Sequence, residues 1–272
     1  MYARLLLLLT LLWAPLAQAQ VNIEKIRTEP SDDGLSGSIS LSTAFSKGNI
    51  DLADFGLGSF VAFKQGDHVV FLVTNGRFAA KRTQGDYLED PQTSLWDDDA
   101  HFSNSGLSHL RYTTTLNKLL AWEAYGQIEY NEFLLLDRRL VVGTGPRFEV
   151  CTGFWLGTSA MFESERLDAE TLVASEDADL SVFRSSTYFT TRWDLSETAT
   201  WLTTVYYQPR IDALSDYRLV GETGLVLAID ERFSFSVDAR IRHDSDPPQT
   251  QPGLADIQPT DIGIKNAISV NW

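Results

Sequence analysis

The run HFSNSG, which begins at His101, places a histidine two residues before a serine. A serine nucleophile needs a histidine within hydrogen-bond reach and an asparagine or aspartate that orients the imidazole. Here Ser105 separates Asn104 from the glycine, and Asn117 lies at the far end of the segment that follows. A polar loop entering a strand explains the run better, so we expect no catalytic residues. A lipid hydrolase built on His101 and Ser103 is the alternative.

Acidic residues form a second candidate site, the run Asp97–Asp99 with Glu89 and Asp90 close by. Calcium takes several oxygen ligands, but the run lacks the glycine-punctuated spacing of an EF-hand loop. The four histidines have no zinc-site spacing either. The sequence therefore predicts a solvated acidic loop with no metal and no cofactor. Divalent ions that bridge this loop to lipopolysaccharide phosphates are the alternative.

The chain begins with a cationic MYAR, an apolar LLLLLTLLWAPLA and a small-residue AQA. This order is typical of a secretory signal peptide, and the apolar run is short of the ~20 residues that a spanning helix needs. We expect residues 1–19 to be removed and residues 20–36 to form a periplasmic N-terminal segment.

Charge and cysteine content exclude further classes. A formal net charge of -15 argues against a nucleic-acid partner, because phosphate binding needs clustered lysine and arginine. The single cysteine, Cys151, cannot form an intramolecular disulfide. Stability must therefore come from hydrogen bonding and packing.

Beyond residue 36 the apolar residues alternate with period two. In LLAWEAYGQIEYNE, Trp122, Ile128 and Tyr130 share one parity, whereas Glu123 and Glu129 share the other. Such alternation predicts strands, and their lengths suit the ~9–11 residues of a tilted membrane strand. Strands are expected near residues 37–46, 52–64, 68–80, 104–116, 119–131, 139–151, 154–165, 179–193, 198–208, 216–229, 232–243 and 262–272.

The links between these strands fall into two alternating sets. KQGD, NK, CTG, DLSE and IDER are tight turns, and longer or more polar segments separate the other pairs. Short periplasmic turns and longer extracellular loops are typical of outer-membrane barrels, as is an aromatic girdle at each interface. The girdle is expected at the short-turn side and comprises Trp122, Trp155, Trp193, Trp201, Phe233 and Trp272.

Charged residues occupy the other parity of the strands, which a membrane barrel turns toward its lumen. This set comprises Arg111, Glu123, Glu129, Arg139, Arg147, Glu149, Glu163, Arg184, Arg192, Glu222, Asp238, Arg240, Arg242 and Lys265. Its mixed sign predicts either a salt-bridged network that fills the lumen or a narrow aqueous path. A wide diffusion porin normally has more strands (~16–18).

The chain closes with DIGIKNAISVNW, in which Ile262, Ile264, Ile268, Val270 and Trp272 share one parity. We expect this face to contact lipid and the terminal aromatic to be recognised by the barrel assembly machinery during insertion. Deleting Trp272 should then impair insertion more than Trp272→Phe.

Several stretches resemble the family of salt-induced outer-membrane proteins, a domain family of unknown function. They are SKGNID after the first strand, LLLDRRLVVGTGPRFEV, and DSDPP followed by PTD and the terminal strand. The resemblance covers 37–272 and implies an outer-membrane β-barrel of a Gram-negative bacterium, linked to salt or osmotic stress, with no assigned catalytic residues. HFSNSG is also similar to a run in outer-membrane phospholipase.

The sequence thus predicts an all-β protein, a closed antiparallel transmembrane β-barrel of about 12 strands over residues 37–272, located in the bacterial outer membrane. Its expected partners are outer-membrane lipid, lipopolysaccharide and the assembly machinery. The expected function is that of a narrow channel or a structural, stress-response envelope protein. The alternatives are the lipid hydrolase and a soluble periplasmic ligand-binding β-protein.

Overall fold

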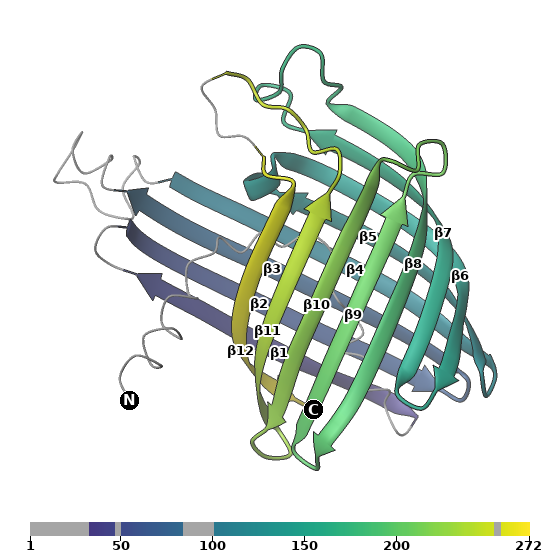
Figure 1. The fold of residues 1–272 in the computed structure, drawn as a ribbon. Helices are drawn as coiled ribbons and strands as arrows, with labels where there is room; N and C mark the ends of the chain where they lie inside the picture. Colours follow the sequence, from purple (N-terminus) through teal and green to yellow (C-terminus); the bar gives the residue numbers. More distant parts are fainter. Residues whose placement is uncertain (1–32, 47–49, 84–100, 253–256) are drawn as a thin grey trace, which may run out of the picture.

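Twelve antiparallel strands close into a barrel in which every strand pairs with its neighbours in chain order (Figure 1). The computed structural model describes residues 33–46, 50–83, 101–252 and 257–272. The strands are β1 (Gly34–Ser46), β2 (Ile50–Gln65), β3 (His68–Thr83), β4 (His101–Asn117), β5 (Leu120–Asn131), β6 (Leu136–Cys151), β7 (Phe154–Leu167), β8 (Asp179–Ser196), β9 (Ala199–Pro209), β10 (Tyr217–Ala228), β11 (Phe233–Asp244) and β12 (Thr260–Asn271). All twelve predicted strands are therefore present. The one described helix is a 3-10 turn, η1 (Glu132–Leu134).

Side chains alternate across the barrel wall with the period of the sequence pattern. On β6, Val142 and Phe148 are exposed on the outer surface, whereas Arg139, Val141 and Arg147 are buried on the inner side. Other strands repeat this arrangement, so large apolar side chains cover the outside while charges lie within. Among the described residues, no helix is long and apolar enough to cross a membrane.

The two rims of the barrel differ in their connections. Tight turns join β2 to β3, β4 to β5, β6 to β7, β8 to β9 and β10 to β11, and Figure 1 shows those of β8 to β11 together at the lower rim. Gly66 and Gly153 hold left-handed backbone conformations in two of these turns, with φ of 57° and 79°. In the β10–β11 turn, the backbone amides of Phe233 and Arg232 donate to Asp230 and lower the pKa of its carboxyl group.

The opposite rim carries the longer connections, among them residues 168–178 and 245–259. Two links at this rim are short, the 3-10 turn before β6 and residues 47–49. Residue Leu172 of one long connection bridges Thr250 of another, which ties the two together. One rim of the barrel therefore carries tight turns, and the other carries most of the longer connections.

The seam between β1 and β12 has fewer residue pairs than any other pairing of neighbouring strands in the barrel. The register joins Ser38–Leu41 to Ile268–Asn271, and Gly37 and Trp272 exchange two backbone hydrogen bonds of 3.1 and 3.0 Å. The sequence placed the start of the barrel at residue 37, but β1 already begins at Gly34 because Gly34–Gly37 pair with β2. The predicted signal peptide lies outside the described residues.

Candidate functional site

A cluster of buried ion pairs crosses the lumen. Arg218 on β10 bonds Glu163 and Glu165 on β7, with N···O distances of 2.8 and 2.9 Å. Two strands, β8 and β9, separate β7 from β10 along the wall. These contacts therefore span the interior of the barrel and do not follow its wall.

The same cluster extends to five further residues. Arg218 Nε also donates to Asp244 at 2.9 Å, and Arg184 donates to Glu163 at 3.1 Å and to Asp216 at 2.9 Å. Arg139 contacts Glu165 and lies 3.4 Å from Glu129. The name central cluster is used below for Arg139, Glu163, Glu165, Arg184, Arg218 and Asp244.

Side chains alternate between the two faces of each strand, and these charges all lie at positions that face inward. Arg218 shares the inward parity of Val220 on β10, and Glu165 shares that of Glu163 on β7. The central-cluster side chains are all at least nine-tenths buried. Because desolvating single charges is expensive, each must be paired, and the cluster provides several partners for each guanidinium.

A second bridge lies closer to the short-turn rim. Arg111 on β4 pairs with Glu123 on β5 at 3.1 Å, and the Tyr188 hydroxyl on β8 donates to the same carboxylate at 2.8 Å. The Arg111 guanidinium lies over the Tyr125 ring, 5.1 Å from its centroid. This Arg111–Glu123–Tyr188 group, the lower bridge, also spans the lumen, since β6 and β7 separate β5 from β8.

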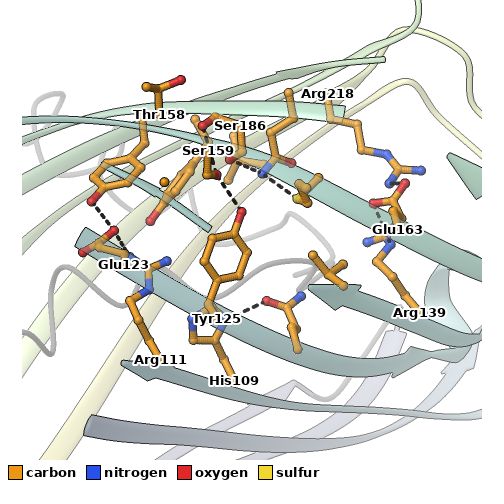
Figure 2. A pocket seen from close by; sticks show the side chains of 18 of the residues that line it. His109, Arg111, Glu123, Tyr125, Arg139, Thr158, Ser159, Glu163, Ser186 and Arg218 are labelled. Atoms are coloured by element: carbon orange, nitrogen blue, oxygen red, sulfur yellow. Dashed lines mark hydrogen bonds and ion pairs between the residues drawn. The ribbon is translucent and has the colours of Figure 1, made fainter. Parts of the chain in front are cut away.

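A small cavity of about 30 Å³ lies between the two bridges, lined by residues of both. Figure 2 shows Arg111 and Glu123 on one side of it, and Arg139, Glu163 and Arg218 on the other. Such a volume holds on the order of one or two water molecules. The lumen is therefore constricted at this depth.

His109 faces the cavity between the bridges. Its Nδ1 lies 3.1 Å from Gln127 Oε1, while its Nε2 is buried and has no hydrogen-bond partner in the described part of the chain. A buried Oε1 of Glu129 is unpartnered within the same described residues. Because buried polar atoms are normally satisfied, these two atoms are sites where a water molecule in the lumen would bind.

Glycines in the GTG motif of β6 leave room for the Tyr125 ring and for the backbone of β7. A Cβ atom on Gly143 would lie 2.4 Å from the Tyr125 ring, and one on Gly145 would lie 2.0 Å from the Thr158 carbonyl oxygen. Gly157 on β7 receives the Tyr188 ring in the same way, at 2.2 Å. The motif that carries part of the family resemblance therefore has a packing role beside the aromatic residues of the lumen.

All fourteen charged residues predicted to face the lumen lie on the inward parity of their strands. The structure brings some of them together in two groups. Arg139 and Arg184 share Glu163, and Arg139 also lies against Glu129, while Arg111 pairs with Glu123. Arg240 and Glu222 form a further pair at 3.0 Å. Arg192 instead pairs at 3.1 Å with Asp194 near the short-turn rim.

The predicted set omits several charged residues of the lumen: Glu165, Arg218, Asp244, Asp216, and the buried pair Asp54 and Arg77 on β2 and β3. The first three lie within three residues of a strand end, where the sequence boundaries are least certain. Parity was the available signal, since Arg218 has the same parity as Glu222, and Glu165 has the same parity as Glu163.

Five of the six predicted girdle residues are exposed on the outside near the short-turn rim. They are Trp122, Trp193, Trp201, Phe233 and Trp272. Trp155 departs from the prediction, because it has the inward parity of β7 and Arg147 lies over its ring at 4.9 Å. Phe154 and Trp155 are consecutive, so they point to opposite sides of the wall.

The candidate hydrolase residues lie at the start of β4, on the long-loop side. Ser103 has the inward parity, and the Asn104 amide donates to Glu132 at 2.7 Å, while the His101 side chain lies outside the described residues. The acidic run 97–99 with Glu89 and Asp90 also lies outside them. Within the described ranges, no three His, Cys, Asp or Glu residues are grouped to hold a metal ion.

A family model described as "Protein of unknown function, DUF481" matches residues 41–258. The fold is similar to the NanC porin (TM-score 0.45, 7% identity, 88% of this chain and 98% of that chain) and to the KdgM porin in complex with disordered oligogalacturonate (0.42, 8%, 86% and 98%). It is also similar to the translocator domain of the autotransporter NalP from Neisseria meningitidis (0.44, 9%, 91% and 91%). No curated protein matches the chain.

Proposed function

The chain belongs to the DUF481 family of proteins of unknown function, and we propose that it is a non-enzymatic barrel of the bacterial outer membrane with a constricted polar lumen. The proposal rests on one observation: large apolar side chains cover the outside, while ion pairs cross the inside. Phe183 is 61% exposed and Ile262 is 59% exposed, both on the outer surface. Water would disfavour so extensive an apolar surface, whereas lipid would cover it.

The contacts inside the lumen favour a narrow path and argue against a wide pore. The central cluster and the lower bridge both span it, and the cavity between them is only about 30 Å³. Solutes of the size that diffusion porins pass would have to displace several buried ion pairs. We therefore propose that the wild-type protein conducts small ions weakly and excludes larger solutes.

Fractionation and planar-bilayer recording test this proposal. The protein should remain with the membrane fraction after alkaline washing and should give small step currents or none. Arg218→Ser should raise the conductance because it removes the contacts that join β10 to β7. Arg232→Ser, which removes an exposed arginine of a tight turn, is the control and should leave the conductance unchanged.

Two outcomes would contradict the proposal. Recovery of the wild-type protein as a soluble periplasmic monomer would exclude the membrane location. Large wild-type currents that Arg218→Ser leaves unaltered would exclude the constriction.

The resemblance to salt-induced outer-membrane proteins adds a proposal on regulation. We expect the cellular amount of the protein to rise with external salt, which immunoblotting of the native host at several NaCl concentrations would measure. An amount independent of salt would leave the membrane proposal intact and would remove this one.

A further inference from the structure

We propose that the outer wall of the barrel over β3–β8 binds a phosphorylated, multiply acylated glycolipid of the lipopolysaccharide type, an inference that rests on the proposed membrane location. Three layers of outward-facing residues, set by the strand registers, carry the inference. They are an arginine layer, a hydroxyl layer and an apolar hollow.

The arginine layer lies next to the long-loop rim. Arg138 on β6 is directly opposite Arg166 on β7, and both side chains are exposed on the outside. Arg166 forms a bidentate contact with Asp179 of β8, with distances of 3.1 and 3.1 Å. Among the described residues, no hydrogen bond or ion pair joins Arg138 to a partner. Asp179 and the nearby Asp137 already offset the charge of Arg166. Arg138 is therefore the cation that a bound anion would neutralise, with the remaining N–H groups of Arg166 beside it.

The hydroxyl layer follows one register step further down the wall. Leu140 is opposite Ser164, and Ser164 is opposite Ser181, whose hydroxyl donates to it at 3.4 Å. Outward-facing hydroxyl groups suit the level of lipid headgroups, which carry hydrogen-bonding atoms. Arginines and hydroxyls together therefore form a polar patch on the lipid-facing side.

The apolar hollow lies below this patch and measures about 740 Å³. Short side chains at Ala124, Gly126 and Ala160 leave the space, while Leu110 and Phe162 are among the larger residues that border it. Val142, which also lines the hollow, is four residues from Arg138, a separation of about 13 Å along the strand.

The position and width of the three layers favour one class of lipid. The polar patch lies at the rim of the longer connections, which the sequence predicts to be extracellular, so that the patch would face the outer leaflet. The hollow extends over six strands, from Val70 on β3 to Phe183 on β8, a width that suits several acyl chains side by side. Arg138, together with the N–H groups of Arg166 that Asp179 leaves free, matches a phosphate by charge and by planar donor geometry.

Equilibrium binding of fluorescent lipopolysaccharide to the folded protein in detergent micelles tests the site. The double variant Arg138→Ala/Arg166→Ala should bind roughly tenfold more weakly, since it loses the charge-assisted contacts to phosphate. Lys118→Ala/Arg232→Ala removes two exposed cations at the opposite rim and should bind as the wild type does. Folding of each variant is checked by its mobility on an unheated SDS gel.

A second pair of variants tests the hollow. Gly126→Leu fills it and should weaken binding, because a Cβ atom there meets no side chain and the leucine would occupy the acyl space. Gly76→Leu is the control, since Gly76 is also outward and unobstructed but does not line the hollow.

Dephosphorylated lipopolysaccharide and phosphatidylglycerol complete the design, and each should compete at least about tenfold less effectively than intact lipopolysaccharide. Equal competition by either lipid would overturn the proposed ligand, and unchanged binding of the double arginine variant would overturn the site. Flotation of the wild type with vesicles separates the two proposals. Protein that floats but shows no lipid preference refutes only the lipid site, whereas protein that does not float refutes the membrane location.

Discussion

Arg218 is the residue on which most of the lumen network converges. It bonds three carboxylates, Glu163, Glu165 and Asp244, from strands on both sides of the interior. In a buried site the loss of one partner leaves the others charged and unpaired, which costs more than the pair itself contributes. Arg218 should therefore be among the lumen charges that matter most to stability, together with Arg139, which lies against Glu129, Glu163 and Glu165.

The first prediction concerns this arginine. Arg218→Met should lower the free energy of unfolding by about 3–5 kcal/mol, the usual cost of breaking a buried pair. Urea unfolding in lipid vesicles, followed by tryptophan fluorescence, measures it. Arg232→Met is the control, and adding Glu165→Gln to Arg218→Met should recover part of the loss. Wild-type stability of Arg218→Met would show that the carboxylates find other partners.

The second prediction compares two glycines of the wall. Gly143→Ala should destabilise the barrel by about 1–3 kcal/mol, because the added methyl group meets the Tyr125 ring at 2.4 Å. Gly126→Ala should be neutral or slightly stabilising, since its nearest neighbour would be a carbonyl oxygen 3.9 Å away. The same unfolding experiment serves both, and equal effects would mean that Tyr125 moves aside freely.

At the level of elements, the seam between β1 and β12 closes the barrel with the fewest contacts between strands. Four residue pairs and the two Gly37–Trp272 hydrogen bonds hold it, whereas β2 and β3 pair over the whole range from Ile50 to Gln65. The terminal tryptophan therefore has a backbone role in addition to the recognition role expected from its side chain.

The third prediction follows from that double role. Deletion of Trp272 should reduce the amount of inserted, heat-modifiable barrel much more than Trp272→Phe, because phenylalanine keeps the two backbone bonds to Gly37 and an aromatic ring. Membrane-fraction immunoblots on unheated gels measure insertion. Insertion of both variants at the wild-type level would show that neither the seam bonds nor the last residue is needed.

The strands and their inward faces could be predicted from the sequence because the period-two pattern fixes both. The partners across the lumen could not, since parity says which way Arg218 points but not how far around the wall Glu163 lies. Trp155 was assigned to the girdle from its nearness to a turn, although the alternation with Phe154 already required one of the two to point inward. Parity was thus the better guide than distance from a turn.

At the scale of the whole molecule, the wall is inverted relative to a water-soluble protein, with apolar residues outside and charges inside. The two rims also differ, and the sequence predicts their direction: tight turns in the periplasm and longer connections outside the cell. The position of the single cysteine makes this direction measurable, because Cys151 is exposed at the end of β6 on the tight-turn rim.

The fourth prediction is therefore a labelling pattern. A membrane-impermeant maleimide added to intact cells should leave wild-type Cys151 unmodified and should modify the variant Cys151→Ser/Ala174→Cys, whose thiol lies on the exposed connection between β7 and β8. Permeabilising the outer membrane should expose Cys151 to the same reagent, which controls for its reactivity. Modification of Cys151 in intact cells, with protection at position 174, would reverse the proposed orientation. It would then place the Arg138–Arg166 pair in the inner leaflet, where glycerophospholipids and not lipopolysaccharide would contact it.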